Sequence, residues 1–243
     1  GGGGGGGGLS SSSGVGGADA GGSGGGGFGG GGKAEDRETW QQWGAAALEA
    51  VTRDRHENQM AVAKAGAIGP LVSLLGAPNE ATQAHAQAAL LHIASAAASD
   101  AIRNAVVRPL VALIESRSPD AQLMSAETIA ILAMKSPANR TSIAAAGAIP
   151  PLVRLLGDGR NVSTSQVHAA AAVADLARVT ENKQVVITGG GVPPLVRMLA
   201  SADLGAQANA ASALCHLAAY STAVPLITRE SGVPLLVAVL KEG

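Results

Sequence analysis

Hydrophobic positions along this chain follow a helical pattern that returns about every forty residues. Each copy contains an apolar stripe with i, i+1, i+3, i+4 spacing, as in Leu71, Val72, Leu74 and Leu75. The Leu-Val pairs that begin the stripes are 39, 42, 43 and 41 residues apart, at positions 71/72, 110/111, 152/153, 195/196 and 236/237. Self-similarity at this period is typical of a solenoid built from short helices.

Three helices are predicted in each repeat. A short first helix ends at a glycine such as Gly66, Gly147 or Gly190, which supplies a left-handed cap. Proline then occupies the first turn of a second helix, where its missing N–H costs nothing, and the apolar stripe follows. A polar break such as 118–120 suits helix capping. Alanine-rich third helices close the repeats, and the sequence places them at 84–94, 121–133, 167–177 and 206–218.

Asparagines recur eight residues before the glycine of a repeat or its equivalent. They are Asn58, Asn139 and Asn182. Because asparagine is a favoured helix N-cap, we expect them to cap the short first helices.

The first 32 residues differ from the rest, because they contain 21 of the 34 glycines. Such a segment cannot bury enough apolar area to offset its chain entropy. We therefore predict a disordered tail over 1–32 and one helical domain over 33–243. The last repeat is expected to be incomplete, because its second helix at Leu235–Leu240 is followed by no third helix. Its apolar side chains are expected to be exposed, which predicts a fragment, end-to-end self-association or a covering subunit.

The phrase Gly147–Val153, in a three-helix repeat, resembles the armadillo (ARM) repeat family, with vacuolar-protein-8-like and armadillo-repeat-only proteins closest in look. The resemblance extends from about Lys33 to Gly243. It implies an all-α, right-handed superhelical solenoid of about four to five repeats. It also implies a concave groove lined by third helices, which holds partner proteins. We therefore expect a scaffold or adaptor without enzymatic activity, in the cytoplasm or associated with the cytoskeleton or an organelle.

Peptide-binding armadillo proteins carry a Trp ladder and, four residues later, an Asn ladder on these helices. The Trp positions here hold Trp43, Ala88, Glu127, Ala171 and Ser212. The Asn positions hold Ala47, His92, Ile131, Asp175 and His216. Further groove positions, one or two turns earlier, hold Trp40, His85, Met124, His168 and Asn209. Only Trp43 matches either ladder, so the resemblance predicts a groove but not its ligand. The tryptophans are expected either to anchor a partner or to cap the core.

Charge, apolar runs and cysteine content argue against several classes of partner and site. The 17 basic and 18 acidic residues form no basic stripe, which argues against nucleic acid as a partner. No uninterrupted apolar run is long enough to predict a membrane span. The single cysteine, Cys215, excludes an internal disulfide and is expected to be a buried thiol.

Neither a metal nor another cofactor is predicted. His85 and His92 lie about 10 Å apart along a helix, too far to share one ion. The stretch Gly27–Lys33 formally matches a phosphate-binding loop. However, Ala34 replaces the required Ser or Thr, and no strand precedes it. Two other functions stay open: a structural subunit of a cytoskeletal or axonemal assembly, and the substrate-binding region of a ubiquitin ligase.

Overall fold

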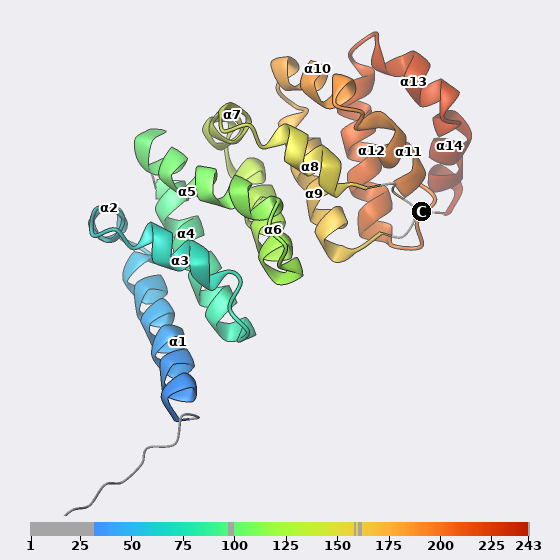
Figure 1. The fold of residues 1–243 in the computed structure, drawn as a ribbon. Coiled ribbons are helices and arrows are strands. Elements are labelled where there is room, and N and C mark those ends of the chain that lie inside the picture. The colour runs from blue at the N-terminus through green and yellow to red at the C-terminus, as the bar shows by residue number, and fades with distance from the viewer. Residues whose placement is uncertain (1–31, 97–99, 158, 160–161, 243) are drawn as a thin grey trace, which may run out of the picture.

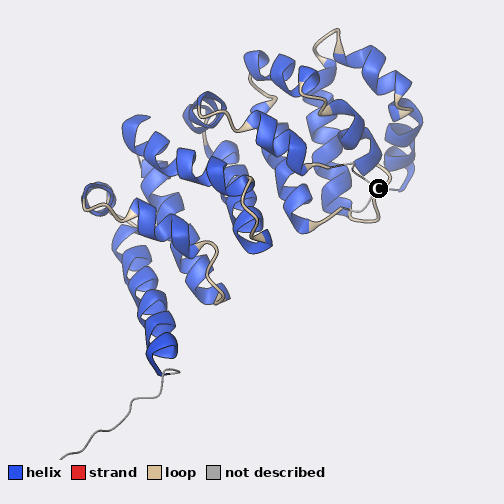
Figure 2. Cartoon of the chain, in the orientation of Figure 1, coloured by secondary structure: helices blue, strands red, loops and turns tan. Residues whose placement is uncertain are grey.

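A computed structural model describes residues 32–96, 100–157, 159 and 162–242, and every regular element in these ranges is an α-helix (Figure 1, Figure 2). The helices are α1 (Gly32–Thr52), α2 (His56–Lys64), α3 (Ile68–Leu74), α4 (Glu80–Ala96), α5 (Asp100–Ile114), α6 (Pro119–Lys135), α7 (Pro137–Ala145), α8 (Ile149–Leu155), α9 (Thr164–Leu176), α10 (Thr180–Thr188), α11 (Val192–Met198), α12 (Leu204–Ala218), α13 (Ala223–Arg229) and α14 (Gly232–Glu242). The predicted all-α solenoid is confirmed. The predicted tail lies outside the described residues, except for Gly32, which begins α1.

The repeats follow one another along a curved stack. Three-helix units are formed by α2–α4, α7–α9 and α10–α12. The long third helices α1, α4, α6, α9 and α12 contact one another in succession along one side of the stack (Figure 1). Helix α1 is thus a third helix with no first or second helix before it among the described residues. Helices α13 and α14 are the first and second helices of another unit.

One repeat departs from the three-helix prediction. Helix α5 is continuous from Asp100 to Ile114 and contains Pro109. Alignment on the Leu-Val pairs places Ala105 where other repeats have glycine. Alanine strongly disfavours the left-handed conformation that would end the first helix, so the first and second helices remain joined.

The glycine caps are confirmed. Gly66, Gly147 and Gly190 have φ values of 82°, 78° and 80°. After Gly147, the N–H of Ala148 donates to the carbonyl of Ile143 at 3.2 Å, which is the long bond of a Schellman motif. This bond turns the chain directly into the second helix.

The core lies between the second and third helices of each unit. Leu71, Leu152 and Leu195 from the second helices are almost completely buried. They pack against third helices whose inward residues are mostly alanine, such as Ala169 and Ala172 of α9, both buried. Small side chains let helix axes approach closely, which allows α9 to contact both α6 and α12.

Amide side chains fix how the helices of a repeat meet. The Nδ2 atoms of Asn139 and Asn182 donate to the carbonyls of Leu132 and Leu176, at the end of the preceding third helix. The prediction that these asparagines cap the next helix was therefore wrong, and Ser136 caps α7 instead. The last carbonyls of a long helix have no partner within the helix. Leaving such a carbonyl buried and unpaired costs more free energy than leaving the exposed N–H groups at the start of the next helix uncapped.

A glutamine near the start of each described third helix after α1 has a related role. Its side-chain nitrogen donates to a backbone carbonyl at the end of the second helix or just after it, at 2.6 to 2.9 Å. These residues are Gln83, Gln122, Gln166 and Gln207. The recurring bond gives a structural register for comparing the third helices.

Candidate binding groove

The predicted groove residues all lie on third helices, and none of the twelve is buried. Trp40 and Trp43 lie on α1, and His85 and His92 on α4. Met124, Glu127 and Ile131 lie on α6, and His168 and Asp175 on α9. Asn209, Ser212 and His216 lie on α12. Their partial exposure is the condition that a side chain must meet to contact a ligand.

One hollow brings together five of these residues from the third helices of three successive repeats. A cavity of about 280 Å³ between α6, α9 and α12 is lined by Ile131, His168, Asp175, Asn209 and Ser212. Met134, with 64% of its surface exposed, also lines the cavity and was not predicted. Its position three residues after Ile131, one helical turn along the same face, is the signal that could have identified it.

A second hollow of about 420 Å³ lies between α4 and α6. The predicted residues Met124 and Glu127 line it. They are joined by Glu80 and Asp120, which come from the first turns of the two helices and were not predicted. No lysine or arginine is among its lining residues, so this hollow is acidic. We call the first hollow the central cavity and the second the acidic cleft.

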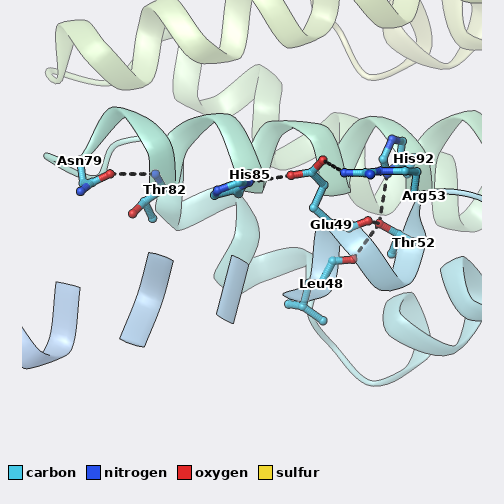
Figure 3. A network of polar contacts seen from close by, with 8 residues as sticks. All are labelled: Leu48, Glu49, Thr52, Arg53, Asn79, Thr82, His85 and His92. Atoms are coloured by element: carbon cyan, nitrogen blue, oxygen red, sulfur yellow. Dashed lines mark hydrogen bonds and ion pairs between the residues drawn. The ribbon is translucent and has the colours of Figure 1, made fainter. Parts of the chain in front are cut away.

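Two predicted histidines hold helices together and line neither the central cavity nor the acidic cleft. The Nδ1 atom of His85 lies 2.6 Å from Oε2 of Glu49, and Nδ1 of His92 lies 3.2 Å from Oγ1 of Thr52 (Figure 3). Both contacts join α1 to α4. The hydrogen bond from His85 lowers the pKa of Glu49, and Arg53, 2.9 Å away from the carboxylate, acts in the same direction against the effect of burial.

Residues near the end of α12 differ from expectation. The pKa of His216 is lowered, chiefly because burial disfavours the imidazolium, and nearby Arg178 adds charge repulsion. Cys215 is exposed, so the prediction of a buried thiol was wrong. The corresponding alanine of α9 is Ala174, which is 6% exposed because α12 covers it. No third helix follows in the described chain to cover Cys215 in the same way.

The asparagine contacts also correct the register of α1. Asn58 donates to the carbonyl of Val51 as Asn139 does to Leu132, so Val51 and Leu132 are equivalent. Trp43 therefore corresponds to Met124, and Ala46 occupies the ladder position equivalent to Glu127. The predicted placement of Trp43 was three residues out of register. Trp40 and Trp43 line neither the central cavity nor the acidic cleft; they are 78% and 67% exposed.

Within the described ranges, no cluster of three or more His, Cys, Asp or Glu side chains is arranged to hold a metal ion. No single described helix is long and apolar enough to cross a membrane. Helices α13 and α14 pass this test only as a pair, and they are bent by 78°.

Comparison with known proteins identifies the repeat. The family model described as Armadillo/beta-catenin-like repeat matches residues 55–95 and 180–219, which contain the units α2–α4 and α10–α12. A search of curated proteins gave no match.

Among solved structures, an engineered protein is 30% identical, with a TM-score of 0.65 over 84% of this chain and 83% of its own. A designed armadillo repeat protein is 26% identical, with a TM-score of 0.62 over 83% and 90% of the two chains. A structure described as computationally designed armadillo repeat proteins for modular peptide recognition is 25% identical, with a TM-score of 0.62 and the same coverage. Together with the three-helix units and their glycine caps, these matches show that the chain belongs to the armadillo repeat family.

Proposed function

We propose that this protein is a scaffold or adaptor that binds an extended, basic segment of a partner protein along its third helices. The observation that carries the proposal is the pair of adjoining hollows on α4, α6, α9 and α12. The acidic cleft offers Glu80, Asp120 and Glu127 to a cation, and the central cavity adds Asp175.

The existing contacts of these carboxylates leave them able to bind a cation. Glu127 accepts one hydrogen bond, at 3.0 Å from the side-chain amide of Gln87. Asp175 lies 3.7 Å from Arg178, too far for a strong hydrogen bond. A carboxylate accepts several hydrogen bonds, so a lysine or arginine of a bound peptide can still pair with either group.

The central cavity supplies a different kind of contact. Ile131 and Met134 give it an apolar wall, while Asn209 and Ser212 supply polar atoms. Such a mixed lining suits an extended segment in which an apolar side chain follows a basic one. The similarity to structures designed for modular peptide recognition supports binding of this type. A cytoplasmic location, with the cytoskeleton or an organelle as a further expectation, stays part of the proposal.

The proposal is tested with the full chain and fluorescein-labelled peptides of alternating lysine and leucine. Anisotropy should show binding that weakens with salt, and an alternating glutamate-leucine peptide should bind poorly. The variant Glu127→Lys/Asp175→Lys should bind the basic peptide about tenfold more weakly, since exposed ion pairs are worth up to about 1 kcal/mol each.

The matched control reverses two exposed carboxylates outside the groove, in Glu57→Lys/Glu181→Lys, on α2 and α10. This variant carries the same change in net charge, so it corrects for general electrostatic attraction. If both double variants lost affinity equally while keeping their helicity, the loss would not come from the groove carboxylates, and the proposed site in the groove would be refuted.

A further inference from the structure

The two ends of the solenoid present complementary parts of one repeat. Helices α13 and α14 are a first and a second helix that no described third helix covers. Helix α1 is a third helix that no described first or second helix covers. Terminal repeats of a solenoid normally need a polar outer face. Here both outer faces are apolar, as a comparison of equivalent positions shows.

The apolar stripe of α14 lacks the cover that the same stripe has in α11. Alignment on the Val-Pro pair makes Val233, Val237 and Leu240 equivalent to Val192, Val196 and Leu199. The three residues of α14 are 53%, 44% and 83% exposed. Their equivalents in α11 are at most 2% exposed. In α11 the stripe is covered by α12 and by the following repeat, whose Gly232 lies beside Cγ2 of Val196, whereas no described helix covers the corresponding face of α14.

The outer face of α12 is open in the same way. Alignment on Gln166 and Gln207 makes Cys215 and Ala218 equivalent to Ala174 and Ala177 of α9. Both α9 residues are buried, while Cys215 and Ala218 are exposed. Two hollows border this open face. One of about 300 Å³ includes Cys215, and one of about 650 Å³ lies beside the first half of α12.

Helix α1 carries the matching stripe on its exposed side. Trp40, Gly44, Ala47 and Val51 follow the i, i+4, i+7, i+11 spacing of one helix face, and all four are exposed. In the register set by the asparagines, they are equivalent to Ala121, Ser125, Thr128 and Leu132 of α6. All four of those residues are buried, and Ser125 donates to the carbonyl of Leu110 in α5. This face of a third helix is therefore the one that seats on its own second helix.

We propose that two copies of this chain associate head to tail, with α1 of one copy seated as the third helix on α12, α13 and α14 of the other. The contact repeats an interface that the fold already uses, between α11 and α12 and between α9 and α12. The two hollows lie beside different halves of the seated α1. Trp40 and Trp43, in the first half of α1, fall beside the larger hollow, and the alanines of its second half beside the smaller.

One pair of opposite charges also lies at the ends that would meet. In a complete unit, the start of the third helix adjoins the end of the second helix, as α12 follows α11 after a short loop. The first turn of α1 contains Glu35, and the last turn of α14 contains Lys241. Head-to-tail seating brings these two side chains to the same edge of the contact. Because this chain presents one face of each kind, such association extends into rings or filaments.

The test uses two blocked variants of the full chain. The tail-blocked variant is Val237→Lys/Leu240→Lys, and the head-blocked variant is Trp40→Lys/Val51→Lys. All four residues are at least 44% exposed, so the lysines should not disturb folding, which circular dichroism checks. If the double substitution unfolds α14, Leu240→Ser alone is used as the tail-blocked variant. The control is Val185→Lys, which changes an exposed apolar residue of α10, away from both ends and from the groove.

Sedimentation velocity should show assembly of the parent chain and the control that increases with concentration. Each blocked variant should sediment as a monomer under the same conditions. An equimolar mixture of the two blocked variants should form a one-to-one dimer, because one free head meets one free tail. In the mixture, maleimide labelling of Cys215 in the head-blocked copy should slow at least tenfold relative to that copy alone.

Other outcomes overturn the proposal. Assembly by the head-blocked variant alone would mean that the tail face pairs with itself or with another surface. A monomeric parent at every accessible concentration would mean that the ends do not bind each other. Blocked variants that stay monomeric when mixed would exclude the specific seating of α1. None of these results bears on the peptide groove, which is tested separately.

Discussion

The left-handed glycine at the end of each first helix allows a sharp test of backbone conformation. Gly147 has φ of 78°, and an added Cβ there would meet no atom within 4 Å. The substitution Gly147→Ala therefore introduces no steric clash with the rest of the fold. Its effect on stability comes from the cost of holding alanine in a left-handed conformation, which is roughly 1–2 kcal/mol.

The matched control is Gly69→Ala in α3. Gly69 is also exposed, and an added Cβ there also meets nothing within 4 Å, but its φ is helical. Alanine at a compatible position stabilises a protein by about 0.4–1 kcal/mol, because it restricts the unfolded chain. The same chemical change should thus have opposite signs at two sites that differ in φ.

Urea unfolding followed by circular dichroism measures both effects, at a concentration low enough to keep the chain monomeric. We expect the midpoint to fall for Gly147→Ala and to rise for Gly69→Ala, with unchanged slopes. In thermal unfolding, Gly147→Ala should lower the Tm by about 2–8 °C, given about 2–4 °C per kcal/mol for a chain of this size. Equal shifts of the same sign for both variants would refute the role of φ.

Three further predictions follow from individual side chains. Ser231 is the one described non-glycine residue with positive φ, at 62°, so Ser231→Gly should raise the free energy of unfolding by about 1 kcal/mol and with it the urea midpoint, and no rise would contradict strain there. Asn139→Ala should cost about 1–3 kcal/mol by leaving the carbonyl of Leu132 unpaired, and more than the control Asn58→Ala, because Asn139 is 2% exposed and Asn58 half-buried. The pKa of His216 is lowered below 6.5, so the unfolded chain takes up a proton first and stability is lost as pH falls through 6.5 towards the folded pKa. His216→Asn should flatten the fall of the Tm as the pH decreases below 6.5, and an unchanged profile would exclude this origin.

The repeat was predictable from sequence because its signals are local. A glycine at the end of a first helix and a Leu-Val stripe after it determine conformation within a few residues, and both were confirmed. The exceptions were also local in origin. Ala105 at a glycine position leaves α5 unbroken, and Ser231 adopts positive φ despite its side chain. The Leu-Val alignment identifies both positions where another residue replaces glycine. It does not predict whether the backbone there adopts a strained positive φ or continues as a helix, because the free energies of these two conformations differ by only a few kcal/mol.

The groove was less predictable because it depends on contacts between repeats. The closing Leu-Ala pairs gave the register of the later third helices but not that of α1. There the register follows from the contact between Asn58 and the carbonyl of Val51. Likewise, no sequence pattern showed that His85 pairs with Glu49, 36 residues earlier. The prediction for Cys215 was wrong because burial of that position depends on a neighbouring helix, not on the residue itself.

The same small residues that build the interior also explain why the ends differ from the groove. On α9, alanines at both flanks allow α6 and α12 to approach, so little apolar surface remains open. On α12 no described third helix covers the equivalent flank, and its apolar surface with two bordering hollows gives shape but no polar selectivity. The groove positions alternate carboxylates, amides and apolar side chains, which discriminate among ligands by charge and hydrogen bonding. A helix already matched to the repeat, as α1 is, fits the first kind of surface, and an extended basic segment fits the second.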